Sequence, residues 1–120
     1  PIEEKYGDKR YFFIRGCIAD QELVPQILKK FQIEAVINFA AESHVDRSIN
    51  DPAPFITTNI NGAHNLLEAS RKANIKRFIQ ISTDEVYGSL GPDGLFSEKT
   101  PVAPNSPYSA SKAAAYLLAR

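Results

Sequence analysis

Short apolar runs alternate along this chain with longer segments in which apolar residues recur every three or four positions. Three of the runs, at residues 11–14, 35–40 and 77–82, are rich in aromatic and β-branched side chains and have the length of strands. The run at 35–40 shows no alternation of apolar and polar positions, which is typical of a strand buried on both faces. The pattern therefore predicts three strands separated by helical segments.

The segments after these runs carry the period of amphipathic helices. Residues 21–31 predict a helix with Asp20 as its N-cap. Pro25 would remove an intrahelical hydrogen bond unless the regular helix begins close to it. From Pro52 the apolar positions recur at helical spacing as far as Asn74, which predicts a second and longer helix.

Residues 88–107 contain four prolines and three glycines and are predicted to form a long irregular loop of the kind that often carries function. Ser106 and Pro107 then fit the N-cap and first turn of a final helix over residues 108–120. Three strands that alternate with three helices predict an α/β fold: a parallel sheet with right-handed crossovers in a doubly wound arrangement.

Composition narrows the classes of function. The 120 residues carry 14 basic and 14 acidic side chains with no run of five like charges, so neither nucleic acid nor an anionic membrane is an expected partner. The apolar stretches are too short to span a bilayer, and no basic and apolar leader opens the sequence. The single cysteine, Cys17, is expected to be a small buried hydrophobe. We therefore expect small-molecule chemistry in a reducing cytoplasm.

Two short segments carry candidate chemistry. Tyr108 and Lys112 lie four residues apart on one face of the last helix, where an ammonium beside a phenol stabilises the phenolate and makes it a usable base. The triplet Thr83–Glu85 follows the apolar run 78–81, where a parallel strand would present its hydroxyl and two carboxylates to a ligand. Alone, the first pair is more often an ordinary exposed helix pair, and the triplet could be a strand-end turn. Their combination favours a catalytic site.

Other polar residues indicate no site on their own. His44 is explained equally well by a polar loop position and by a substrate contact. His64 lies within the long predicted helix and has no second ligand spaced for it, so no metal site is predicted. Asp46 and Arg47 fit a surface ion pair.

A glycine-rich phosphate loop is not found in the sequence: no Gly-x-Gly-x-x-Gly turn occurs in the 120 residues. If the fold binds a dinucleotide, its first strand and phosphate loop precede Pro1. The chain is also small for an α/β domain of that kind. We therefore expect a domain truncated at both ends, which on its own neither holds a dinucleotide tightly nor turns over a substrate.

The order of these motifs resembles the dTDP-glucose 4,6-dehydratases, a family within the extended short-chain dehydrogenase/reductase superfamily. The catalytic signature of the superfamily, Tyr-x-x-x-Lys at the start of a helix, matches Tyr108 and Lys112. The resemblance covers essentially the whole chain. The other matching motifs are residues 39–48, Thr58-Asn59, residues 82–88 and Asn105 to Tyr108. Related epimerases and decarboxylases generally lack the acidic pair Asp84 and Glu85, which suits a dehydration.

The resemblance implies a role for each residue of the candidate site. Tyr108 would take the proton from the sugar 4-hydroxyl during oxidation at C4, Lys112 would hold the cofactor ribose hydroxyls, and Thr83 would hydrogen-bond the reacting oxygen. Glu85 would then remove the C5 proton while Asp84 protonates the departing C6 hydroxyl, and hydride would return to C6. The implied reaction is the hydro-lyase conversion of dTDP-glucose to dTDP-4-keto-6-deoxyglucose, with NAD regenerated in each cycle.

The resemblance also implies the central part of an NAD-binding Rossmann domain, with the glycine-rich loop and the substrate lobe outside residues 1–120. The residues implied to bind NAD, besides Tyr108 and Lys112, are Cys17, Ile18, Phe39, Ala40, Ala41, Glu42, Ser43 and Thr58. The residues implied to bind substrate are Ser43, His44 and Thr83. Cys17 departs from the acidic residue usual at its position, and a thiol is a weaker partner for the adenine amino group.

The resemblance implies a homodimer in which the long helix and the Tyr108 helix pair with their copies. The apolar stripe from Phe55 to Leu67 fits such a pairing, although a stripe that faces the sheet would explain it as well. Two other functions stay open: a related nucleotide-sugar epimerase or decarboxylase, and a catalytically silent NAD-binding scaffold of the same fold. The residues that read the nucleotide base are expected beyond Arg120.

Overall fold

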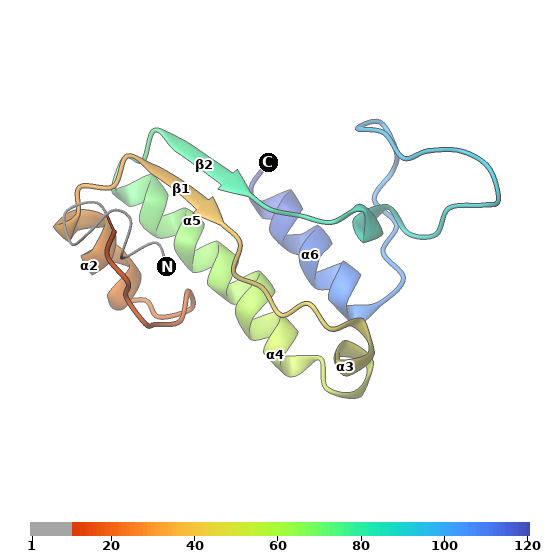
Figure 1. Ribbon diagram of the computed structural model, residues 1–120, viewed down its shortest axis with the longest axis horizontal. Coiled ribbons are helices and arrows are strands. Elements are labelled where there is room, and N and C mark those ends of the chain that lie inside the picture. The colour runs from red at the N-terminus through yellow and green to blue at the C-terminus, as the bar shows by residue number, and fades with distance from the viewer. Residues whose placement is uncertain (1–10) are drawn as a thin grey trace.

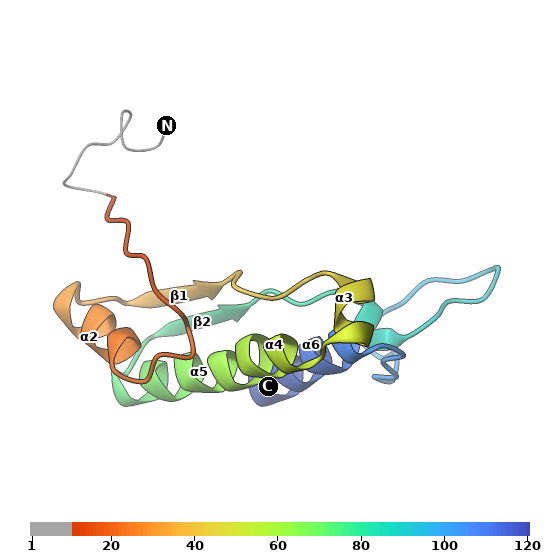
Figure 2. The same cartoon turned by 90° about the horizontal axis from the view of Figure 1, so that it is seen from below.

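The computed structural model describes residues 11–120, which form a two-stranded parallel sheet covered by helices on one face (Figures 1 and 2). Strand β1 spans Ala35–Asn38 and pairs in parallel with β2, Arg77–Gln80, in a register that sets Ala35 opposite Arg77. Helices α2 (Leu23–Lys30), α5 (Ala63–Lys72) and α6 (Pro107–Leu118) lie on the same side of the strands. The predicted α/β architecture with parallel strands is confirmed.

The core lies between α2, α5 and the covered face of the sheet. Its buried apolar side chains come from the two helices, and partly buried residues in and beside the strands pack against them. These residues are Val24, Leu28, Leu66 and Ala69, with Ile33, Val36, Ile75 and Phe78 at the margin. Within the described part of the chain, no helix combines the length and the apolarity that crossing a membrane requires.

Helix α2 begins at Leu23, two residues later than predicted, with Glu22 rather than Asp20 at the N-cap position, although Asp20 still bonds the start of the helix. One carboxylate oxygen of Asp20 accepts hydrogen bonds from the backbone N–H groups of Glu22 and Leu23, both at 2.9 Å. These hydrogen bonds hold the pKa of Asp20 below its ordinary value. Pro25 is the third residue of the helix, where the first-turn N–H groups have no intrahelical acceptor, so the proline costs the helix little.

The long predicted helix is a continuous helical rod with a π-helical segment in its middle. It comprises α4 (Ala53–Phe55), the π segment η1 (Ile56–Gly62) and α5, and the chain leaves it at Asn74, whose φ of 54° is left-handed. The predicted extent is confirmed, but the π turn was not predicted. Ile18 packs closely over Gly62, because a Cβ atom at residue 62 would lie only 2.7 Å from Ile18 Cγ1.

Two predictions about the strands are wrong. Residues 11–14 take no regular secondary structure, since neither β1 nor β2 pairs with them and a strand needs a neighbour for its backbone hydrogen bonds. Phe12 instead packs its ring on Phe31, with centroids 5.0 Å apart. Strand β1 is also buried on one face only, because the helices cover a single side of the sheet and leave Ile37 54% exposed.

The C-terminal part of the chain begins with a turn and ends with α6. The 3₁₀ helix η2 spans Asp84–Tyr87, with Thr83 as its N-cap. Helix α6 starts with a capping box: the Ser106 hydroxyl accepts from the Ser109 N–H, and the Ser109 hydroxyl accepts from the Ser106 N–H. The predicted start of this helix is confirmed. A short helix, α3 (Val45–Asn50), was not predicted.

Candidate functional site

The carboxyl ends of β1 and β2 run into two loops that lead toward α3 and η2 (Figure 1). Asn38, 3% exposed, fixes the point at which these loops diverge. Its amide nitrogen donates to Gln80 Oε1 at 3.0 Å, and its amide oxygen accepts from the Ala40 N–H at 3.0 Å. Its carbonyl accepts from the Ile81 N–H at 3.1 Å. The two loops therefore start from one hydrogen-bonded junction.

Lys112 ties the last helix to the loop after β2. Its side chain is 5% exposed, and its Nζ donates to the Ile81 carbonyl oxygen at 2.7 Å. Burial lowers the pKa of Lys112 below its ordinary value, because desolvation disfavours the ammonium. An ammonium has three N–H donors, and Ile81 supplies the one acceptor that it has among residues 11–120. The remaining donors suit the hydroxyl groups of a ligand.

Tyr108 lies in the first turn of α6, one helical turn before Lys112. Its side chain is 8% exposed and packs edge-on against Phe55, with ring centroids 6.4 Å apart and planes at 77°. Its backbone N–H donates to the Ser48 hydroxyl at 3.0 Å. The Tyr108 ring therefore packs on the start of the long helical rod, while its backbone is bonded to α3.

The triplet Thr83–Glu85 forms the turn that opens η2. Thr83 Oγ1 accepts from the Glu85 N–H and donates to Asp84 Oδ1, both at 3.3 Å. Asp84 is exposed and Glu85 is half-buried. Because η2 packs against α6, and Lys112 bonds the carbonyl two residues before Thr83, the structure brings the triplet into the same region as the Tyr108 helix.

The loop after β1 is held by Asn59 from the middle of the π segment. Asn59 is 2% exposed; its amide oxygen accepts from the Glu42 N–H at 2.8 Å and its amide nitrogen donates to the Glu42 carbonyl at 2.9 Å. The same nitrogen donates to Ser111 Oγ at 2.8 Å. Phe39 and Ser43 stay exposed on this loop, and the Glu42 carboxylate reaches Arg47 at 3.9 Å. The backbone of this loop is thus held by Asn59, while the side chains of Phe39 and Ser43 are exposed.

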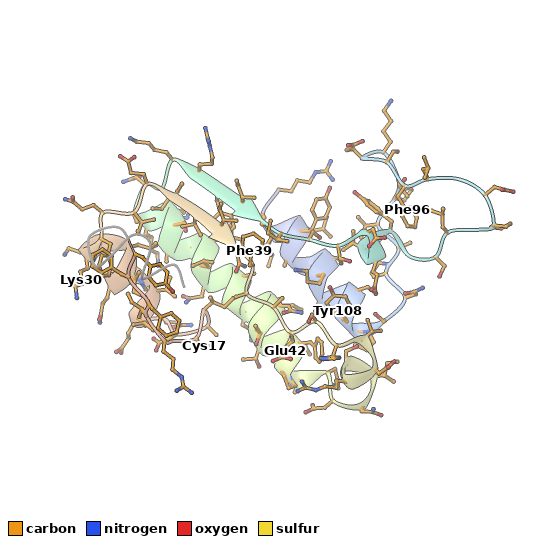
Figure 3. The ribbon with its side chains drawn as sticks, viewed as in Figure 1. Cys17, Lys30, Phe39, Glu42, Phe96 and Tyr108 are labelled. Atoms are coloured by element: carbon orange, nitrogen blue, oxygen red, sulfur yellow. The ribbon has the colours of Figure 1, made fainter. Side chains whose placement is uncertain are left out.

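The other residues predicted to bind the cofactor, Cys17, Ile18 and Thr58, lie in separate segments of the chain. Cys17 is exposed, so the expectation of a buried thiol is wrong. The Ile18 carbonyl accepts from Asn65 Nδ2 at 2.8 Å, which anchors this segment to the rod. Figure 3 shows Cys17, Glu42 and Tyr108 in that order from the α2 side toward α3 and the start of α6. Thr58 is half-buried in the π segment, next to Asn59.

Two predicted substrate residues occupy the outer part of the β1 loop. Ser43 and His44 are both exposed, and His44 is the N-cap of α3 without a side-chain capping bond. The His44 carbonyl accepts from the Ser48 N–H at 3.1 Å. The loop that carries these residues therefore leads directly into the helix that contacts the Tyr108 backbone.

Sequence reasoning missed the residues that hold the site together. Asn59 sits at helical spacing between Phe55 and Ala63, so a polar residue on an apolar stripe was an available signal. Ser48, which is fully buried, gave no such signal because α3 itself was not predicted.

Comparisons with known proteins show the family to which the sequence is similar. The sequence model of a family described as GDP-mannose 4,6 dehydratase matches residues 2–120. The chain is 52% identical over 123 residues to the dTDP-glucose 4,6-dehydratase of Xanthomonas campestris pv. campestris (strain B100), with 95% of this chain and 35% of the relative covered. The chain spans about a third of the length of the curated relatives it matches.

Solved structures of nucleotide-sugar enzymes with NAD bound are also similar to this chain. A crystal structure of dTDP-glucose 4,6-dehydratase from Streptomyces venezuelae, with NAD and a second ligand bound, matches with a TM-score of 0.90 and 42% identity, over 98% of this chain and 36% of that one. The UDP-glucose 4-epimerase of Thermus thermophilus, in complex with NAD, matches with a TM-score of 0.85 and 33% identity, over 91% of this chain and 35% of that one.

Proposed function

This chain belongs to the GDP-mannose 4,6 dehydratase family, and from that premise we propose that the full-length product of its gene is an NAD-dependent nucleotide-sugar 4,6-dehydratase. Its substrate in this proposal is dTDP-glucose and its product dTDP-4-keto-6-deoxyglucose. The observation that carries the proposal is the Thr83–Glu85 turn, which packs at the end of β2 beside the helix of Tyr108 and Lys112. A relative named dTDP-glucose 4,6-dehydratase is identical to this chain at about half of the aligned positions.

The arrangement of the residues fits NAD. A dinucleotide is an extended ligand, and Cys17, Glu42 and Tyr108 lie one after another along the molecule in Figure 3. Ala40 and Ala41 have small side chains, which let a ligand come close to the loop backbone. The unused donors of Lys112 suit ribose hydroxyls. Bound NAD would accept the hydride that leaves C4 and would return it to C6 after the elimination, as C5 regains a proton.

Tyr108, Lys112 and Thr83 act in the oxidation of the sugar. The Lys112 ammonium stabilises the phenolate form of Tyr108, which removes the proton of the 4-hydroxyl and becomes the neutral phenol. The Thr83 hydroxyl donates to the same sugar oxygen in place of its 3.3 Å hydrogen bond to Asp84 Oδ1. The ketone formed at C4 acidifies the proton on C5.

Asp84 and Glu85 act in the elimination. Glu85 removes the proton from C5, and Asp84 protonates the C6 hydroxyl, so that the C6–O bond breaks and water leaves. Without an acid the leaving group would be hydroxide, and a positioned acid or base typically contributes ~10²–10⁴-fold to the rate.

The proposal also covers the domain, the oligomeric state and the cellular location of the protein. Residues 1–120 form the central part of the NAD-binding domain, and the protein acts as a homodimer in the cytoplasm. The helical rod and α6 lie side by side on one face of the sheet, which supports pairing through these two helices (Figure 2).

The test uses the purified full-length gene product with dTDP-glucose, and identifies the product by mass spectrometry and NMR. A 4-keto-6-deoxy product is expected from the wild type. Asp84→Asn and Glu85→Gln should each lower kcat ~10²–10⁴-fold while NAD binding is retained. Asp93→Asn is the matched control, because Asp93 is an exposed carboxylate of the following loop.

Two other products of this experiment would overturn the proposal. A 4-epimer would indicate the epimerase alternative, which the likeness to a UDP-glucose 4-epimerase supports. Tight NAD binding without turnover would indicate a silent scaffold.

A further inference from the structure

The first turn of α6 has one backbone donor that another element satisfies. Pro107 has no N–H, the Ser109 N–H is bonded by the Ser106 hydroxyl, and the Ala110 N–H is bonded by the Ser106 carbonyl. The Tyr108 N–H instead donates to Ser48 Oγ on α3, at 3.0 Å. Tyr108 is therefore the residue of this turn whose backbone position depends on a side chain 60 residues away.

The Ser48 hydroxyl makes two hydrogen bonds, one as donor and one as acceptor. Its side chain is 0% exposed, and its hydroxyl donates to the Val45 carbonyl at 2.6 Å while it accepts from Tyr108. The direction of the hydroxyl hydrogen is thus fixed by Val45, which leaves the oxygen lone pairs for the Tyr108 N–H. Water has no access to replace the bond at a fully buried position.

The Ser111 hydroxyl bonds the backbone carbonyl of Tyr108. Ser111 Oγ donates to the Tyr108 carbonyl at 2.7 Å and accepts from Asn59 at 2.8 Å. Asn59 also holds the backbone of Glu42. The N–H and carbonyl groups of Tyr108 are therefore bonded by two buried serines, one of them linked through Asn59 to the β1 loop.

We propose that Ser48 is a positioning residue, which sets the placement of the Tyr108 phenol relative to the sugar hydroxyl by fixing the start of α6. The inference rests on the proposed function, in which Tyr108 acts as the base. The phenol lies at the far end of a rigid ring, so a small rotation of the first turn displaces the reacting oxygen. A misplacement of about 1 Å can cost about 10²-fold in rate.

The experiment compares variants of Ser48 in the full-length gene product. Ser48→Ala and Ser48→Cys remove or weaken the acceptor, and Ser48→Thr keeps the hydroxyl. The matched control is Ser70→Ala, since the Ser70 hydroxyl is also buried but has no hydrogen-bond partner among residues 11–120. The readouts are kcat and KM for the nucleotide sugar, each per folded enzyme, and the NMR signal of a ¹³C-labelled Tyr108 ring in the absence of substrate.

We expect Ser48→Ala and Ser48→Cys to lower kcat by roughly 10–100-fold with KM within about twofold of the wild type, because binding groups are untouched. Ser48→Thr should return kcat to within about threefold, and Ser70→Ala should leave it unchanged. The Tyr108 ring signal should move in the first two variants and return in the third. If one of the first two variants does not fold, the other gives the result.

A purely structural role gives a different result. In that case kcat per folded enzyme stays within about threefold of the wild type in every folded variant, and the proposal is overturned. It is also overturned if folded Ser48→Thr is as slow as Ser48→Ala. If the wild type forms no 4-keto-6-deoxy product, the proposed function fails, and the Tyr108 ring signal still decides whether Ser48 positions the phenol.

Discussion

At the scale of single residues, the site depends on groups whose ordinary preference is for water. Lys112 is 5% exposed and has one acceptor in the described chain, the Ile81 carbonyl. A buried ammonium costs folding free energy unless it is paired with a charge. The protein therefore gives up stability to keep a cation one helical turn after Tyr108, as is expected where a charge serves a ligand or a reaction.

The destabilisation caused by the buried Lys112 ammonium can be tested by measuring the free energy of unfolding as a function of pH. The pKa of Lys112 is lowered by burial in the folded protein, whereas the unfolded chain has the ordinary value of 10.5. Between these two pKa values the unfolded state binds more protons, so stability rises with pH; below both values the cost of the buried charge is present in full. We expect the free energy of unfolding of the wild type, relative to Lys112→Met, to increase as pH rises toward 10.5. Denaturant titrations of both proteins from pH 7 to 10.5 measure this, and a decrease would contradict it.

Residue spacing was enough to predict part of the site. The Tyr108 and Lys112 pair is a local helical pattern, and the structure places its helix against the Thr83–Glu85 turn as the sequence indicated. Ser48 could not be found in this way, because its role depends on a hydrogen bond that joins residues 60 positions apart. Residue types specify local chemistry, whereas such partners are set by tertiary packing.

At the scale of elements, the β1 loop and α6 are joined through the π segment of the helical rod. A π turn adds a residue to the helix and re-aims the side chains around it, and such turns often lie at functional sites. Here the segment carries Asn59, whose amide bonds both backbone groups of Glu42 and also Ser111. The rod therefore fixes the spacing between the loop proposed to hold NAD and the helix proposed to carry the base.

Removal of this amide should affect folding and cofactor binding together. We expect Asn59→Ala to lower the free energy of unfolding by about 1–3 kcal/mol, because buried backbone groups of Glu42 lose their partners. The dissociation constant for NAD should rise roughly tenfold as the loop loses its anchor. Asn61→Ala is the control, since Asn61 lies in the same segment but is exposed. Calorimetry with NAD and denaturant unfolding measure both effects; equal behaviour of the two variants would refute the role of Asn59.

The turn that carries the two carboxylates depends on one glycine. Gly88 ends η2 with a φ of 89°, and a Cβ atom there would collide with the Ala103 carbonyl oxygen. We expect Gly88→Ala to lower the free energy of unfolding by about 1–3 kcal/mol. Gly91→Ala, in the same loop, should be neutral, since nothing lies within 4 Å of its added Cβ. Thermal unfolding of both variants tests this, and an equal loss in both would show that the strain at residue 88 is not the cause.

The elements that sequence reasoning predicted well are those with local determinants. Ser106 marks a helix start that the structure confirms, and Asp20 bonds the N–H groups of Glu22 and Leu23 at the start of α2, which begins at Leu23. Residues 11–14 have the composition of a strand, but composition supplies no partner, and in the described chain no strand lies beside them. The π segment was missed because its extra residue changes the helical period only locally.

At the scale of the whole molecule, the sheet has one covered and one open face. Ile37 is 54% exposed and Ile79 is 41% exposed, and Figure 2 shows the helices gathered on the opposite side of the strands. Apolar strand residues left open to water are a surface that binds dyes and other chains.

This surface predicts the behaviour of the 120 residues taken alone. We expect the isolated polypeptide to bind the dye ANS and to self-associate, because Ile37 and Ile79 expose adjacent apolar area on one face. The pair of substitutions Ile37→Thr and Ile79→Thr keeps strand propensity while it removes apolar area, and should weaken both dye fluorescence and association. Leu95→Thr is the matched control, since Leu95 is 93% exposed but lies in the loop rather than on the sheet. Fluorescence and sedimentation velocity measure the two effects, and a fall produced equally by the Leu95 variant would show that general apolar exposure, rather than the open face of the sheet, drives association.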